Sequence, residues 1–289
     1  MQRTKHTKAD AILCSDIHLR EDTPTCYVGN FQQEQWDGLD FVSELQKNHD
    51  CIVLHAGDLF HHWKPSPWLL SKAMIHLPEN FHTIYGQHDL PQHNLEMSFK
   101  SGIATLENAG KVKVLPGCSW GMEVENESIN ITGLRILVWH HLTYQQKPFP
   151  GAEGGMANGI LRKWPIFDLI LTGDNHTPFV ETYKHRLLVN PGSFTRQTAA
   201  QQNHKPRVYL WYAVTNTVVP VYLPIDENAI SRAHIEKVEE RDARIDAFVS
   251  QLNDDWEASM SFEENLKQFQ TTNKVKDSVM QIIYKSIGL

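Results

Sequence analysis

Five clusters of Asp, His and amide side chains stand out, because each directly follows a short apolar run. They are Asp16 with His18, Asp58, Gln87 with His88 and Asp89, His140 with His141, and Asp174 with His176. Carboxylates combined with imidazoles suit Mn²⁺, Fe²⁺ or Zn²⁺ better than Mg²⁺ or Ca²⁺, which prefer oxygen ligands alone. Two such ions about 3.5–4 Å apart, joined by a bridging carboxylate, can clamp both oxygens of a phosphoryl displacement. The clusters therefore predict metal-dependent chemistry on phosphate esters.

Composition limits how such a site could be used. Histidine is frequent, at 16 of 289 residues, and 27 Lys and Arg against 34 Asp and Glu give a net charge of −7. Any contact with DNA must therefore depend on a local patch, a metal site or a partner. A content of 41% hydrophobic and 21% charged residues excludes disordered and collagen-like chains. The polar N-terminus and the lack of a long apolar run predict no signal peptide, no membrane span and a cytoplasmic location.

The elements that must position the clusters alternate between strands and helices. Apolar strands are expected within segments 11–20, 51–62, 81–91, 134–141, 167–176 and 186–194, and helices at 31–49 and 67–77. This alternation predicts an α/β sandwich with buried strands. All five clusters fall at the carboxyl ends of strands, the edge at which open α/β sheets bind ligands. A hairpin around Thr215 and Asn216 is expected to complete a sheet.

A change of pattern near residue 228 predicts a domain boundary. Residues 1–228 would form a catalytic domain, and residues 229–289 a helical segment with apolar side chains at helical spacing. Two readings of that apolar stripe stay open, an ordinary core and a surface for partner docking or dimerisation. The glycine-rich stretch 151–159 is either a mobile lid over the site or a surface loop.

The five clusters resemble the motifs of the calcineurin-like metallophosphoesterases, which usually read D-x-H, G-D, G-N-H-D/E, H and G-H-x-H. Further detail resembles the branch of SbcD-type DNA nucleases, namely GDLFH at 57–61, GQHDLP at 86–91 and NPGSFTR at 190–196. The resemblance covers about residues 10–225. It implies a four-layer α/β/β/α sandwich, followed here by a C-terminal helical appendage.

The resemblance also implies a role for each metal-binding residue. Asp58 would bridge two metal ions. The first site would be completed by Asp16, His18 and His176, and the second by Gln87, His140 and Asp174. A hydroxide held between both cations would attack phosphorus in line.

Three further residues are expected to act on the substrate. His88 would stabilise developing charge and protonate the leaving oxygen as a general acid. Asp89 would orient and polarise that imidazole, and His61 would contact substrate. His140 is preferred to His141 as a ligand because it stands first after its strand. The remaining histidines near the motifs are expected not to be ligands: His55, His62, His76 and His93.

Two residues depart from the family pattern. Gln87 stands where the family usually has Asn, so that an added methylene must be absorbed or the amide will not reach the metal directly. Asp174 stands where the first His of G-H-x-H is usual. A carboxylate there favours Mn²⁺ or Mg²⁺ over Zn²⁺.

The leading hypothesis for function is a metal-dependent phosphodiesterase, a compact, phage-like DNA exo- or endonuclease of SbcD type. Two divalent ions are expected as cofactors, Mn²⁺ first, with Mg²⁺ or Fe²⁺ as alternatives. Expected partners are DNA, an SMC-like ATPase of SbcC type and a second copy of the chain. The alternatives are a small-molecule phosphodiesterase or phosphatase on the same scaffold, and a degenerate phosphoesterase fold that only binds partners.

Overall fold

The computed structural model describes residues 8–125, 127–147, 151, 153–233, 235, 241–245 and 261–287. The chain divides into two compact units, residues 1–231 and 232–289. The boundary predicted near residue 228 falls at the end of the first unit. Among the helices described, none has both the length and the apolar character needed to cross a bilayer.

The first unit contains a six-stranded sheet of order β13-β12-β1-β2-β3-β4. Its strands are β1 (Ala11–Cys14), β2 (Ile52–His55), β3 (Phe81–Thr83), β4 (Val112–Val114), β12 (Arg207–Tyr212) and β13 (Thr217–Tyr222). Strands β1 to β4 run parallel, and β12 pairs antiparallel with both β1 and β13. The hairpin predicted around Thr215 and Asn216 is confirmed, with Tyr212 opposite Thr217.

A second, five-stranded sheet has the order β10-β11-β9-β6-β5. Its strands are β5 (Ile129–Ile131), β6 (Leu134–Trp139), β9 (Leu169–Thr172), β10 (Phe179–Tyr183) and β11 (Arg186–Asn190). The central strands β6, β9 and β11 are parallel, and the edge strands β5 and β10 pair antiparallel. Sequence analysis missed both edge strands, because their side chains are only partly buried and form no continuous apolar run.

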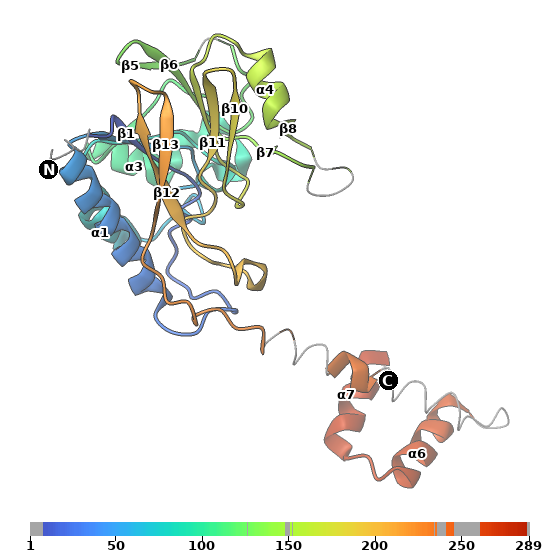
Figure 1. The fold of residues 1–289 in the computed structure, drawn as a ribbon. Coiled ribbons are helices and arrows are strands. Elements are labelled where there is room, and N and C mark those ends of the chain that lie inside the picture. The colour runs from blue at the N-terminus through green and yellow to red at the C-terminus, as the bar shows by residue number, and fades with distance from the viewer. Residues whose placement is uncertain are drawn as a thin grey trace, which may run out of the picture. The chain divides into compact units, whose positions relative to one another are not determined.

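Helices cover the outer face of each sheet. They are α1 (Phe31–His49), α2 (Pro67–His76), α3 (Gly102–Asn108) and α4 (Ala157–Lys163), with short 3₁₀ turns η1 (Gln87–Asp89), η2 (Pro91–His93), η3 (Leu95–Lys100) and η4 (Ala199–Gln201). Asn30 caps α1 by accepting the backbone N–H of Gln33. Figure 1 shows α1 and α3 on one side of the strands and α4 on the other.

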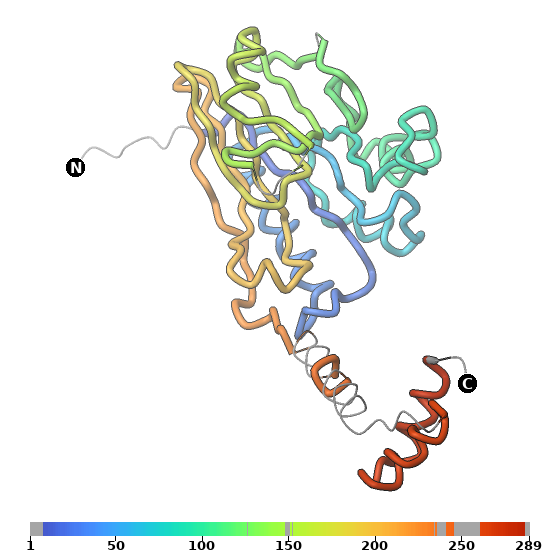
Figure 2. Tube along the Cα trace, turned by 90° about the vertical axis from the view of Figure 1, so that its right-hand side faces the viewer, coloured from blue at the N-terminus to red at the C-terminus, as the bar shows by residue number. Residues whose placement is uncertain are grey.

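Three apolar clusters define the layers. Alternate residues of a strand point to opposite faces, so Leu13 packs between the two sheets while Ile12 packs under α1, α2 and α3. Leu137 lies on the outer face of the second sheet, beneath α4. In Figures 1 and 2 the hairpin of β12 and β13 lies beside β10 and β11 of the other sheet, and Trp211 and Val189 share the inner cluster. The predicted four-layer α/β/β/α sandwich is confirmed.

The glycine-rich stretch is only partly a loop. Gly155–Met156 forms the short strand β8, which pairs with β7 (Thr143–Tyr144), and α4 begins at Ala157. Residue 152 lies outside the described residues.

Two helices are described in the second unit, α6 (Phe262–Thr272) and α7 (Asp277–Ile287). Ser261 and Glu264 form a reciprocal cap at the start of α6. Leu266, Phe269 and Met280 are buried, whereas Phe262, Val279 and Ile282 are exposed, and the assignment of 229–289 as one helical segment stays a prediction. Most of the apolar stripe predicted between 235 and 256 lies outside the described residues.

Candidate active site

Tight turns after β1, β2, β3, β6 and β9 bring the predicted residues together at the carboxyl ends of both sheets. Backbone φ is positive at several of these turns: 50° at Asp16, 49° at His18, 58° at Asp58 and 73° at Asp174. This left-handed conformation costs a non-glycine residue about 1–2 kcal/mol. Strain of this kind concentrates where side chains must be aimed for function.

A first group consists of Asp16, His18 and His176, with one ligand atom from each within 4.8 Å of the others. Nε2 of His18 lies 3.2 Å from Nε2 of His176, and Oδ1 of Asp16 lies 3.8 and 3.7 Å from these atoms. Burial lowers the pKa of both histidines and raises the pKa of Asp16 to about 7. Two neutral imidazoles beside a carboxylate are a donor set suited to a divalent transition metal.

Asp58 joins this group to a second one, formed by Asp16, Asp58 and His140. Its Oδ2 lies 3.6 Å from Nε2 of His18 and 3.6 Å from Nε2 of His140. This oxygen is buried and has no hydrogen-bond partner among the residues that the structure describes, whereas Oδ1 accepts the backbone N–H of His88 at 2.9 Å. A buried, unpaired carboxylate oxygen is costly, and cations on either side would satisfy it. The geometry fits the bridging role predicted for Asp58.

His140 is held in the orientation that a ligand needs. Its Nδ1 donates to the carbonyl oxygen of Ala56 at 2.5 Å, which turns Nε2 toward the centre. That Nε2 lies 2.6 Å from Oε1 of Gln87, whose Nε2 donates to Oδ1 of Asp174 at 2.6 Å. Although burial opposes it, the carboxylate of Asp58 raises the pKa of His140 to about 10. The longer amide of Gln87 thus still brings its oxygen to His140.

The two histidines predicted to act on substrate, His61 and His88, form with His18 a third group whose ligand atoms lie within 4.8 Å of one another. The rings of His61 and His88 are 5.5 Å apart at 21°, and His88 meets His18 edge-on at 4.9 Å. Nδ1 of His88 donates to the carbonyl oxygen of His61 at 3.0 Å. Burial and the Arg20 guanidinium lower the pKa of His61 to about 4. His61 is therefore a neutral group at physiological pH.

The carboxylate of Asp89 bonds to backbone N–H groups and not, as its predicted role would require, to the imidazole of His88. Its buried carboxylate accepts the backbone N–H groups of Asp58 (2.8 Å), Leu59 (3.3 Å), Phe60 (3.0 Å) and Gly86 (3.0 Å). The group that fixes the imidazole of His88 is instead the carbonyl oxygen of His61. The expectation that Asp89 polarises His88 is corrected accordingly: Asp89 holds the loop that carries Asp58. A short side chain cannot both fill this ring of donors and reach the imidazole.

The other histidines lie apart from these groups. His141 stacks on Trp139, with ring centroids 4.0 Å apart, and belongs to none of the ligand groups found in the described part of the chain. The same holds for His55, which contacts Oγ1 of Thr83, and for His76, which contacts Asp40. His62 and His93 also lie outside the groups found among the described residues.

Sequence reasoning missed three supports of the site. The hydroxyl of Ser15 donates to Asp16, and the carbonyl oxygen of Ala56 fixes His140. Gly57 has φ of 91°, and an added Cβ would lie 2.5 Å from Nδ1 of His140. Gly57 was visible in the G-D motif, whereas nothing in the sequence marks a backbone carbonyl as a partner.

Comparison with known proteins agrees with this geometry. Residues 10–216 match the model of the calcineurin-like phosphoesterase superfamily domain, so the chain belongs to that superfamily. It is thus a metallophosphoesterase, a class of hydrolases that use divalent metal ions, and the three groups of possible ligands found among the described residues fit such ions. No curated protein matches the chain significantly.

The solved structures that resemble the chain do so only distantly. A novel archaeal phosphodiesterase shares 14% identity over 74% of this chain and 99% of its own, with a TM-score of 0.44. A predicted phosphoesterase from Streptococcus pneumoniae shares 14% identity over 70% of this chain and 80% of its own, with a TM-score of 0.35. A putative 5′-nucleotidase from Staphylococcus aureus shares 13% identity over 80% of this chain and 58% of its own, with a TM-score of 0.45. Likenesses this remote indicate no substrate.

Proposed function

We propose that this metallophosphoesterase is a metal-dependent phosphodiesterase acting on nucleic acid, with DNA as substrate and Mn²⁺ as the preferred ion. The observation that carries the proposed two-metal chemistry on phosphate esters is the unpaired Oδ2 of Asp58 between Nε2 of His18 and Nε2 of His140. Two divalent ions, when bound, supply Lewis acidity and lower the pKa of water. The remaining steps depend on side chains of this chain.

His88 is the proton donor in this proposal. Because its Nδ1–H is bonded to the carbonyl oxygen of His61, Nε2 is the atom free to exchange a proton with a substrate oxygen. A positioned general acid contributes about 10²–10⁴-fold to a rate. His61 stacks against this ring and keeps it in place.

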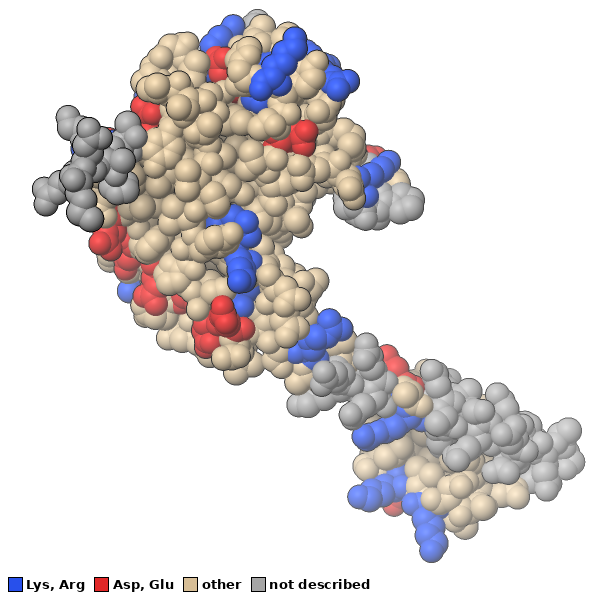
Figure 3. Space-filling model, viewed as in Figure 1, with Lys and Arg blue, Asp and Glu red and all other residues tan. Residues whose placement is uncertain are grey.

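A basic hollow beside His176 supports nucleic acid as the substrate. It has a volume of about 400 Å³ and is lined by His176, Lys205 and Arg207, among others. Figure 3 shows Lys and Arg side chains in a short row near the middle of this face of the first unit. A chain of net charge −7 needs such a local patch to attract a phosphate backbone. Assembly with an SMC-like ATPase through residues 229–289, and dimerisation, stay predictions.

The test is hydrolysis with added Mn²⁺ of linear duplex DNA, single-stranded DNA and a chromogenic phosphodiester. We compare the wild type with His88→Ala and with His62→Ala, an exposed histidine outside the ligand groups. His88→Ala is expected to lose about 10²–10⁴-fold in kcat with its metal content unchanged, and His62→Ala to match the wild type. Cleavage of the chromogenic diester alone would support the phosphodiesterase activity and contradict DNA as the substrate. Failure on every substrate with metal bound would contradict the proposal as a whole.

A further inference from the structure

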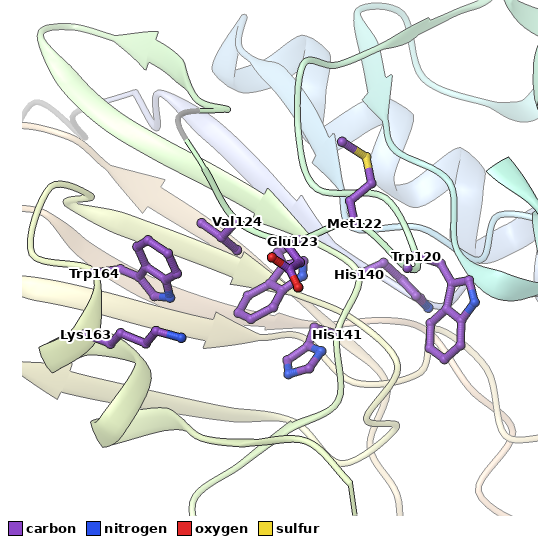
Figure 4. A pocket seen from close by; sticks show the side chains of 10 residues that line it. Trp120, Met122, Glu123, Val124, His140, His141, Lys163 and Trp164 are labelled. Atoms are coloured by element: carbon purple, nitrogen blue, oxygen red, sulfur yellow. The ribbon is translucent and has the colours of Figure 1, made fainter. Parts of the chain in front are cut away.

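A second pocket lies beside the candidate metal centre and shares only His140 with the predicted metal ligands. It has a volume of about 530 Å³. Figure 4 shows Trp164 and Lys163 on one side of it, Trp120 on the opposite side and His141 between them. The segment from Gly121 to Val124 completes the wall. Nothing in the chemistry assigned above uses this pocket.

The pocket is linked to the metal centre by His140, and His141 follows it in the chain. His140 and His141 both line it, yet the imidazole of His140 is buried against Gln87 and Asp58. Consecutive Cα atoms are about 3.8 Å apart, and side chains at the end of a strand alternate between its two faces. The pocket therefore reaches a predicted metal ligand, just beyond the carboxyl end of β6.

The walls offer flat aromatic surfaces with a charged rim. His141 stacks on Trp139 at 4.0 Å with an angle of 1° between the rings. Nζ of Lys163 lies 5.0 Å from the ring of Trp164. Trp120, Trp139 and Trp164 are each only partly buried, so their rings can still cover a ligand. Glu123 adds an exposed hydrogen-bond acceptor.

We propose that this pocket binds the nucleobase of the nucleotide whose phosphate is hydrolysed at the metal centre. Planar heteroaromatic rings stack on indole and imidazole faces regardless of base identity, and their polar edges can meet Lys163 and Glu123. An aliphatic chain could pack against the aromatic walls but has no polar edge to meet Lys163 and Glu123. The inference rests on the proposed function, since it names the part of a nucleic-acid substrate that lies next to the cleaved bond.

The test compares two esters with the same leaving group, thymidine 5′-(p-nitrophenyl phosphate) and methyl p-nitrophenyl phosphate, both with Mn²⁺. The variants are Trp164→Leu and, as a matched control, Trp68→Leu, which removes an indole that is 43% exposed on α2. The loss of one base–aromatic stack corresponds to about 5- to 150-fold in kcat/KM. We expect that loss for Trp164→Leu on the thymidine ester alone, with Trp68→Leu unchanged on both esters.

A binding measurement separates failure of the pocket from failure of the proposed function. Saturation-transfer NMR follows the ring protons of thymidine with the metal-free protein in EDTA. If neither ester is hydrolysed, the phosphodiesterase proposal fails, and a thymidine signal that Trp164→Leu abolishes still supports the pocket. If the methyl ester is hydrolysed and Trp164→Leu affects both esters equally, or neither, the base-binding inference is overturned. A wild type that shows no thymidine signal overturns it as well.

Discussion

Replacing Gly57 by alanine should displace the imidazole of His140, a predicted metal ligand, without changing that residue itself. Gly57 has φ of 91°, and an added Cβ would lie 2.5 Å from Nδ1 of His140 and 2.8 Å from the backbone nitrogen of Gly86. Ordinary Cβ contacts begin near 3.4 Å. Both contacts must therefore be relieved, the one with His140 by a shift of about 1 Å, and a misplacement of that size at a catalytic centre costs about 10²-fold in rate.

The chain offers a matched control for this substitution. Gly133 has φ of 89°, and its added Cβ would meet nothing within 4 Å. Gly133→Ala therefore isolates the cost of the left-handed backbone, about 1–2 kcal/mol. Gly57→Ala adds overpacking of about 1–3 kcal/mol. Urea unfolding of both variants should show Gly57→Ala to be the less stable by that added amount.

Metal content and activity complete the comparison. Gly133→Ala is expected to keep the metal content and kcat of the wild type, because the turn between β5 and β6 lies outside the ligand groups. Gly57→Ala is expected to bind less Mn²⁺ after dialysis and to lose about 10²-fold in kcat. If both glycine variants show equal stability and full metal content, His140 is not held where the structure places it.

Three further predictions concern the surroundings of the centre. Asp89→Asn should cost about 1–3 kcal/mol in urea unfolding, because a buried N–H loses its acceptor; a shift in the pH profile of kcat would instead restore Asp89 as the partner of His88. Gln87→Asn should withdraw the amide from Asp174 and weaken Mn²⁺ binding about 10- to 100-fold, measured by metal content at graded Mn²⁺; undiminished binding would show that the amide is not needed. Burial lowers the pKa of His55 from 6.5 to about 3, so on acidification the unfolded chain takes up a proton before the folded one does. Stability should therefore fall by about 2 kcal/mol more between pH 7 and pH 5 in the wild type than in His55→Gln, and equal slopes would contradict this.

The sequence was informative wherever a function depends on a residue type next to a strand. Asp16 and His18 follow a continuous apolar run, and Asp58 follows another, so both the strands and their polar ends could be predicted. The structure brings these residues within reach of one another. The edge strands β5 and β10 could not be found in this way, since partly exposed strands carry a weaker apolar signal.

Contacts between distant backbone groups escaped prediction for a different reason. The carboxylate of Asp89 accepts N–H groups from residues 29 to 31 positions earlier in the chain. Every residue except proline has such a group, so nothing in the sequence marks the ones that converge. The pattern supplied the right residue for the site, and only the fold shows that Asp89 positions a loop.

The two departures from the family pattern also acquire a common explanation in the structure. Gln87 is longer than the usual Asn, and Asp174 is shorter than the usual His. Their side chains meet at 2.6 Å, so the length gained by one residue compensates for the length lost by the other. Since the amide nitrogen is committed to Asp174, the amide oxygen is the atom that faces His140. The pair thus fixes which end of the amide is offered to a cation.

That exchange changes the charge of the centre as well as its shape. A carboxylate at position 174 removes one positive charge from the loaded site relative to a neutral histidine, and favours hard ions such as Mn²⁺ or Mg²⁺. A less positive centre attracts a phosphodiester less strongly, so cations outside the ligand set must contribute more. Under the proposed function, Lys205 and Arg207 in the hollow next to His176 supply this positive charge to a phosphate backbone.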